Sequence, residues 1–368
     1  STTKMPRGKK KTPKVGRRGG ADSGHPTDDE YDTADNQSVI SSASDKDSVI
    51  AEGGDDDVAE TNAQEVFEEK LKDCMEELTQ KSAKGRVEAL HRLRRGMCQK
   101  YIYDFFTDRK VTLADALEKC LKKGKGEEQN EAARCAAILL LQLGMGPAAD
   151  EIYAELQPTL QVVLADNTAA LRGRSGCAES LSMCTFLASG DKEHTQAVMK
   201  SLENVFKKSY LKGDGNAPSI GPEVAALHTS ALSAWTLLLS IAPVSVVGDL
   251  IDSHLPKLPQ LLTSADVELR IAAGEAIALL YELAREEDEE FDGDDIDSLC
   301  ETLKQLATDS NKFRAKKDRR QQRSSFRDVL RTVEEGDAPS YHIKFGIENV
   351  RLDSWAKKCQ YDEMCHLL

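Results

Sequence analysis

The sequence contains no apolar run long enough to cross a bilayer. The longest runs, at residues 136–141 and 235–241, fall far short of the roughly 20 residues that a membrane-spanning helix needs. No apolar stretch follows the basic first residues, so a secretory signal is also missing. We therefore expect a soluble protein with no membrane partner.

The nine cysteines form no CxxC pair, and the usual signatures of catalysis are absent. Most of the cysteines lie in apolar helical patterns, where a free thiol packs as a small hydrophobic group; this favours a reducing compartment. There is no P-loop, HExxH, GxSxG or strand-linked GxGxxG motif. Cys359, Cys365 and His366 are too few and too widely spaced for structural zinc. We predict no catalytic residue, metal, cofactor or small-molecule substrate.

The net charge of −14 hides charge blocks of opposite sign. Residues 1–21 carry eight Lys or Arg and no acid, whereas residues 22–60 carry thirteen acids and one lysine. Residues 286–297 add nine acids and no base, in a run that lacks the ligand positions and central glycine of a calcium loop. Residues 312–331 hold nine Lys or Arg against two Asp. A locally basic surface is therefore compatible with an acidic protein.

The first 62 residues show neither a helical nor a strand period and hold one aromatic residue, Tyr31. Their Gly, Ser, Asp and Lys content is typical of disordered segments. We predict three parts: a disordered basic-then-acidic tail at 1–62, a helical solenoid at 63–310, and a basic helix with a C-terminal segment at 311–368.

From residue 64 to about residue 335 the apolar period is helical, and there is no alternating strand segment of any length. Four segments (131–143, 172–181, 224–239 and 268–281) share a half of small residues and a Leu-rich half. Aligning Arg134, Arg174, His228 and Arg270 gives intervals of 40, 54 and 42 residues, the periods of armadillo or HEAT units. The predicted fold class is all-α: an armadillo/HEAT-like α-solenoid with a disordered N-terminal tail.

Local spacing also predicts two helix boundaries before the first repeat. Apolar residues recur every three or four positions through 85–106, which indicates one helix. Thr112 is expected to cap the start of the next helix, and Gly124 to end it.

The segment 311–331 is the most informative. On a helix, one face of it is basic: Lys316, Arg320, Arg323, Arg327 and Arg331. Nine bases in twenty residues repel one another unless an anion neutralises them, and RNA or DNA phosphate is the obvious partner. The candidate RNA-binding residues are Lys312, Arg314, Lys316, Lys317, Arg319, Arg320, Arg323, Arg327 and Arg331. A possible second basic patch comprises Lys119, Lys122, Lys123 and Lys125. The alternative for 311–331 is a solvated helix paired with the acidic run 286–297.

Several motifs occur in the order KSAKGR (81–86), TLADALEKCLKKGKGEEQ (112–129), LRIAAGE (269–275), LATDSNK (306–312), QRSSFRDVLR (322–331), and IKFG (343–346) with DSW (353–355). From about residue 65 to the end, the chain thereby resembles the interferon-related developmental regulator family. The resemblance implies a non-enzymatic armadillo-like protein of cytoplasm and nucleus, associated with translationally inactive ribosomes and with transcriptional corepression. Similar proteins continue past the position of Leu368 with a further segment and a basic tail, which implies a truncated chain here.

Two functions are therefore open. In the first, ribosomal RNA and ribosomal proteins hold the solenoid and its basic helix on the ribosome, where the protein represses translation by occupying space that messenger or transfer RNA needs. In the second, the solenoid scaffolds nuclear corepressor proteins, and the basic segments 4–18 and 312–323 serve nuclear import. The long single basic face favours the first, because an import signal needs only a short exposed cluster.

Overall fold

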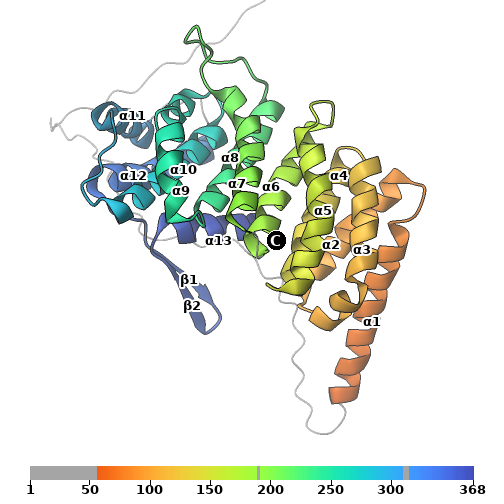
Figure 1. Cartoon of the computed structure of the whole chain (residues 1–368). Helices are drawn as coiled ribbons and strands as arrows, with labels where there is room; N and C mark the ends of the chain where they lie inside the picture. The colour runs from red at the N-terminus through yellow and green to blue at the C-terminus, as the bar shows by residue number, and fades with distance from the viewer. Residues whose placement is uncertain (1–55, 189–190, 310–314) are drawn as a thin grey trace, which may run out of the picture. The chain divides into compact units, whose positions relative to one another are not determined.

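The computed structural model describes residues 56–188, 191–309 and 315–368, which are mainly helical (Figure 1). The α-helices are α1 (Asp56–Glu77), α2 (Ala83–Gln99), α3 (Tyr103–Lys123), α4 (Glu127–Leu143), α5 (Pro147–Ala165), α6 (Leu171–Leu187), α7 (Lys192–Phe206), α8 (Pro222–Leu239), α9 (Val244–His254), α10 (Val267–Glu287), α11 (Ile296–Thr308), α12 (Lys316–Glu335) and α13 (Trp355–Leu367). Two short 3-10 helices, η1 (Lys207–Ser209) and η2 (Leu258–Thr263), and two strands, β1 (Tyr341–Phe345) and β2 (Glu348–Leu352), complete the described elements.

Helices α1 to α12 stack as consecutive pairs. The even-numbered helices α2 to α12 form an inner row in which each helix contacts the next, and each also packs against the helix that precedes it in the chain. The apolar faces of the pairs merge into one continuous core. This stacking confirms the predicted armadillo/HEAT-like α-solenoid.

Small residues let neighbouring inner helices approach closely, as their positions in the repeats predict. A Cβ atom on Gly176 of α6 would lie 2.8 Å from the Cα atom of Asn130 in α4. A Cβ atom on Gly274 of α10 would lie 2.7 Å from Cε1 of Phe326 in α12. Both distances are shorter than van der Waals contact, so a side chain larger than hydrogen fits at neither position unless the neighbouring atoms move.

The structure corrects the alignment of the first repeat. Arg174 donates to the carbonyl of Leu164 near the end of α5, and Arg270 donates to the carbonyl of Ser264 just before α10. His228 bonds to Ser209 of η1, the element that precedes α8. Arg134 instead lies two turns into α4 and donates to carbonyls of α13. The equivalent of Arg174 is thus at the start of α4, about one turn before Arg134.

The predicted boundaries between residues 85 and 124 are partly wrong. The single helix expected at 85–106 is broken, since α2 ends at Gln99 and α3 begins at Tyr103, and Thr112 lies inside α3 instead of starting it. The cause is Gln142 of α4, whose side chain donates to the carbonyls of Met97 and Lys100 and accepts from the backbone N–H of Ile102. The end at Gly124 is confirmed.

The N-terminal boundary also differs from the prediction. Helix α1 begins at Asp56, so residues 56–62 of the expected disordered tail are helical. The rest of the predicted tail, residues 1–55, lies outside the described residues.

A β-hairpin follows α12, although no strand was expected. Strands β1 and β2 pair antiparallel, with Tyr341 opposite Leu352 at the base and Phe345 opposite Glu348 at the tip. Gly346 occupies the turn with φ of 60°, a conformation that glycine adopts without strain. The alternation of Tyr341, Ile343 and Phe345 with polar residues was the available signal, but it is only five residues long.

Helix α13 runs back across the inner row from α12 toward α4 (Figure 1). Its N-terminus is held by Glu282 of α10, which accepts from the backbone N–H groups of Trp355 and Ala356. Further along, Lys358 pairs with Glu275 of α10, and His366 lies 3.3 Å from Glu179 of α6. At its end, Arg134 of α4 donates to the carbonyls of His366 and Leu367. One helix thus connects the first and last thirds of the solenoid.

Most cysteines pack as the sequence predicts: seven of the nine are buried, and Cys98 and Cys365 are exposed. Among the described helices, none combines the length and the hydropathy that a membrane span requires.

Candidate nucleic-acid interface

Helix α12 carries the predicted basic face, here called the α12 stripe: Lys316, Arg320, Arg323, Arg327 and Arg331. Arg320, Arg327 and Arg331 are exposed, as is Lys317 beside them, while Arg323 is half-buried. Lys312 and Arg314, also predicted to bind RNA, lie outside the described residues. Five cations therefore follow one side of the helix over about four turns.

The opposite side of α12 fixes the helix to the solenoid. Phe326, Val329 and Val333 are fully buried against α10 and α11. The buried Gln322 accepts from the Arg270 guanidinium of α10 and donates to Asp309. Because these contacts settle the rotation of the helix, the stripe is held in one orientation.

The stripe has no acidic partner within the described part of the chain, although α12 does form one ion pair, between Glu334 and Lys304 of α11. The acidic run 286–297 comprises the last two residues of α10, the loop that follows and the first two residues of α11, so most of it lies in a loop between helices, as expected. Arg285 donates to the carbonyl of Phe291 and lies 3.7 Å from Asp292, and Tyr281 donates its hydroxyl proton to the carbonyl of Asp292. Pairing between this run and the α12 stripe, the alternative weighed from the sequence, is absent among the described residues.

Arg319 differs from the other candidates. It lies between the stripe and the buried side of α12, is half-buried, and its Nε atom is buried without a hydrogen-bond partner among the described residues. Its contribution to a surface that faces an anion is therefore smaller than that of Arg320 or Arg327.

The second predicted patch lies at the end of α3, on a different helix pair from α12. Lys119, Lys122, Lys123 and Lys125 are all exposed. Lys122 forms an ion pair with Glu118 at 2.8 Å, which lowers the pKa of that carboxyl group. Lys119 and Lys123 line a cavity of about 880 Å³ between α1, α2 and α3, but acids such as Glu76 and Asp115 line it as well. Charges of both signs therefore surround this second patch, in contrast to the α12 stripe.

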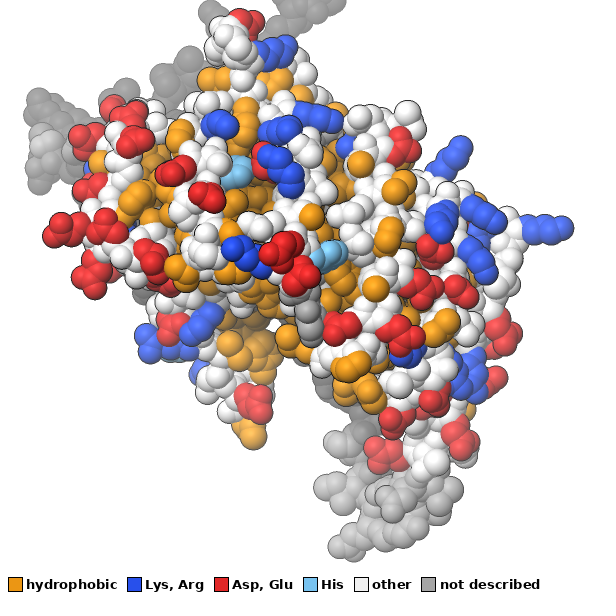
Figure 2. Space-filling view, in the orientation of Figure 1, with side chains coloured by type: hydrophobic (Ala, Val, Ile, Leu, Met, Phe, Trp, Pro, Cys, Tyr) orange, Lys and Arg blue, Asp and Glu red, His pale blue; other side chains and the backbone are white. Residues whose placement is uncertain are grey.

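Sequence reasoning missed a third group of lysines. Burial lowers the pKa of the His254 ring, and the nearby Glu203 carboxylate raises it. Lys257 and Lys200, far apart in sequence, both lie near the ring and lower its pKa by smaller amounts. Lys207 and Lys208 on η1 donate to the neutral side chains of Asn204 and Asn167. Figure 2 shows Lys and Arg side chains gathered over the α7–α9 part of this face, with acids concentrated toward α11. Only the Lys207–Lys208 doublet was visible in the sequence.

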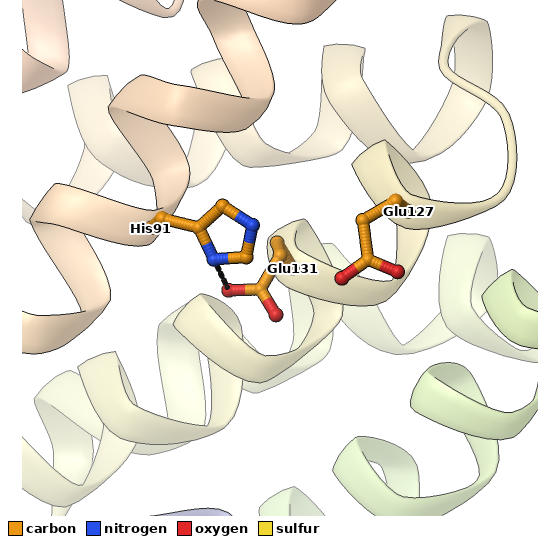
Figure 3. Close-up of side chains that lie close together, drawn as sticks. All are labelled: His91, Glu127 and Glu131. Carbon is orange, nitrogen blue, oxygen red and sulfur yellow. Dashed lines mark ion pairs between the residues drawn. The ribbon is translucent and has the colours of Figure 1, made fainter.

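One group of side chains has the composition of a metal site but the contacts of an ion-pair network (Figure 3). Atoms of His91, Glu127 and Glu131 lie within 4.8 Å of one another. Glu131, however, already accepts from Arg94 at 2.8 Å, and Glu127 lies 3.2 Å from Arg172. A cation would have to displace both guanidinium groups, so we interpret the group as a link between α2, α4 and α6.

The model of the interferon-related developmental regulator family matches residues 36–334, most of the chain. The chain belongs to this family. Interferon-related developmental regulator 1 of Sus scrofa is 44% identical over 344 residues, which cover 93% of this chain and 76% of that protein. Interferon-related developmental regulator 2 of Mus musculus is 49% identical over 307 residues, which cover 83% of this chain and 69% of that protein.

Among solved structures, a designed armadillo repeat protein aligns with 71% of this family member and 99% of its own chain, at a TM-score of 0.42 and 16% identity. That likeness is too low to support an argument. The assignment of the fold rests on the helix pairs described above.

Proposed function

We propose that this protein binds the ribosome through ribosomal RNA and represses translation sterically, without catalysing a reaction. The bound protein would occupy space that messenger or transfer RNA needs on an inactive ribosome. The α12 stripe supports the proposal most directly, because its cations are fixed in orientation and have no acidic partner among the described residues. A chain of net charge −14 approaches a polyanion only through such a local surface.

The test is the combined replacement Arg320→Glu, Arg323→Glu and Arg327→Glu. Melting should barely change, because Glu and Arg have similar helix propensities and surface substitutions usually change stability by less than about 0.5 kcal/mol. Co-sedimentation with purified ribosomes should fall at least roughly tenfold near physiological salt. Each lost phosphate contact lowers the magnitude of the slope of log K against log salt concentration by about 0.7–0.9. For the triple variant this slope should therefore be smaller in magnitude by about 2 than for the wild type.

The matched control reverses three exposed cations elsewhere: Lys70→Glu, Lys84→Glu and Arg95→Glu. It changes the net charge equally, so a loss specific to the α12 variant separates local contact from overall charge. A stably folded α12 variant that sediments like the wild type across a salt series contradicts the proposal. If the wild type and the α12 variant both associate weakly with ribosomes, and the α12 variant is altered in nuclear entry, the corepressor function is favoured instead.

The steric part of the proposal has its own measurement. Ribosomes loaded beforehand with messenger and transfer RNA should bind the protein less well than vacant ribosomes, because the same space is already filled. Equal binding to loaded and vacant ribosomes would leave RNA contact intact but overturn steric repression.

A further inference from the structure

Two prolines, Pro256 and Pro259, interrupt the helical chain after α9. A proline has no N–H group and its ring clashes with the preceding helical turn, so these residues do not extend α9. The helix ends at His254, and the chain continues as the short 3-10 helix η2. A cavity of about 540 Å³ lies beside this interruption, lined by residues of α9, η2, α11 and the loop between α10 and α11. We call it the α9–α11 cavity.

The lining of the α9–α11 cavity is largely apolar. Ile251 and Leu255 of α9 line it together with the buried Leu299 of α11. Phe291 of the loop also lines it, and its ring packs edge-on against that of Tyr281, with 5.5 Å between the ring centroids. Cavities of about 300–1,000 Å³ with apolar and aromatic linings are typical ligand sites. An apolar side chain of a ligand is therefore a better occupant than a hydrated ion.

Three aspartates also line the cavity and are exposed to solvent: Asp252, Asp294 and Asp295, here called the rim aspartates. Within the described residues, no lysine or arginine lines the cavity and none of the rim aspartates forms an ion pair, since the neighbouring Arg285 pairs with Asp292. Figure 2 shows hydrophobic side chains among acids toward α11. An apolar cavity is thus bordered by charge of one sign.

The loop that carries two of the rim aspartates is packed against α10. Tyr281 donates its hydroxyl proton to the carbonyl of Asp292 at 2.9 Å. Gly293 follows with φ of 71°, which favours glycine, and a Cβ atom there would lie 2.7 Å from Oη of Tyr281. The backbone just before Asp294 and Asp295 is therefore held in place, and their carboxylates border the cavity without a cation to neutralise them.

We propose that the α9–α11 cavity binds a basic segment of a partner protein. An apolar side chain of the segment enters the cavity, and Lys or Arg side chains on either side of it pair with the rim aspartates. Charge complementarity selects this occupant, because the same carboxylates repel nucleic acids and acidic peptides. The inference goes beyond the proposed function and does not depend on it. The α12 stripe and this cavity carry opposite charges, so they suit different partners.

Synthetic peptides test the proposal by fluorescence anisotropy with the full chain at low salt. The probes are labelled KKRxxRKK peptides in which the two central residues are Leu, Ile, Met, Phe or Trp. Matched control peptides carry Ser-Ser at the centre, or Leu-Leu between glutamate flanks. At least one apolar-centred peptide should bind at least roughly tenfold more tightly than the Ser-Ser peptide. The glutamate-flanked peptide should not bind. Equal binding of the apolar-centred and Ser-Ser peptides overturns the proposal, as does binding of neither.

Replacing all three rim aspartates by asparagine tests the charge contribution. Asparagine is close to aspartate in size, and Asp295 caps α11 without a side-chain hydrogen bond, so melting should barely change. Peptide affinity should fall at least roughly tenfold. The matched control removes three negative charges from exposed acids of α1 and α3: Glu65→Gln, Asp73→Asn and Asp108→Asn. An equal loss of affinity in both variants would show that net charge, and not the cavity, attracts the peptide.

Filling the cavity tests the apolar contribution. Ser298 lines it, so Ser298→Trp should abolish the preference for an apolar centre and leave the affinity for the Ser-Ser peptide unchanged. Ser253→Trp is the matched control, because Ser253 is exposed on α9 and does not line the cavity. A preference that persists in a stably folded Ser298→Trp variant overturns the proposal. Self-association of the wild type that the asparagine variant lacks would also overturn it, since a second copy would then be the occupant.

Discussion

His228 shows that equivalent positions in different repeats can carry different types of side chain. Its ring is buried in α8 and bonds to the hydroxyl of Ser209, at the place where other repeats use an arginine to reach a carbonyl. Burial lowers the pKa of His228 to about 4, and the nearby cations Lys208 and Arg174 contribute in the same direction. The folded protein therefore holds the neutral ring.

A neutral buried histidine makes stability depend on pH. Since the pKa is lower in the folded than in the unfolded state, the unfolded chain binds a proton first, and stability is lost as pH falls from 6.5 toward 4. Between about pH 6.5 and 5 the loss from His228 should be about 2 kcal/mol. We expect His228→Gln, which keeps a polar group for Ser209, to lack this component in urea unfolding across that range. A wild-type-minus-variant difference that does not change with pH would contradict the assignment.

Helix α6 depends on its glycines for the contact with α4. Replacing Gly176 by alanine would place Cβ against the backbone of Asn130, which cannot move without shifting the whole helix. We expect Gly176→Ala to lower the free energy of unfolding by about 1–3 kcal/mol, as in other overpacked cores.

Gly248→Ala in α9 is the matched control, because nothing lies within 4 Å of the added methyl group. There alanine should stabilise the protein by roughly 0.5–1 kcal/mol through its better helix propensity. Thermal melting tests this contrast: the melting temperature should fall for Gly176→Ala and rise for Gly248→Ala. Shifts of the same sign in both variants would show that helix propensity, and not packing against α4, determines the stability of Gly176→Ala.

The solenoid and the basic face of α12 were predictable because both follow from local periodicity. Phe326 and Val333 mark the buried side at helical spacing, so the opposite position of Arg320 and Arg327 follows. The break between α2 and α3 was not predictable, since it depends on Gln142, which is 40 residues beyond Ile102 in the sequence. The RNA-binding roles of the α12 residues remain predictions.

The hairpin and the helix that follows it escaped prediction for a related reason. The strands are five residues each, too short for the alternation of Ile343 and Phe345 to stand out from loop sequence. Likewise, nothing local to residues 355–367 indicates that this helix returns to Arg134. Long-range contacts of this kind leave no period in the sequence.

Helix α13 should make the solenoid unfold as one unit. Stacked repeats contact only their neighbours and can unfold in parts, but α13 touches α4, α6, α8 and α10 at once. Trp355→Ala removes a buried anchor of α13 and leaves Trp235 as the single tryptophan. In this variant the urea transitions followed by circular dichroism and by tryptophan fluorescence should separate, whereas in the wild type, whose fluorescence comes from both tryptophans, they should coincide. The control Met145→Ala changes a side chain that is 76% exposed and should leave them coincident. Coincident transitions in Trp355→Ala would mean that the repeats cooperate without α13.

The return of α13 to α4 also sets an order for folding during synthesis. The hydrogen bond between Arg134 and His366 closes a loop of 232 residues, so it forms only after every helix pair between them has left the ribosome. Until then the nascent chain exposes the surface of α4, α6, α8 and α10 that α13 later covers. Newly made solenoid is therefore most vulnerable to aggregation and chaperone capture just before residues 355–367 emerge.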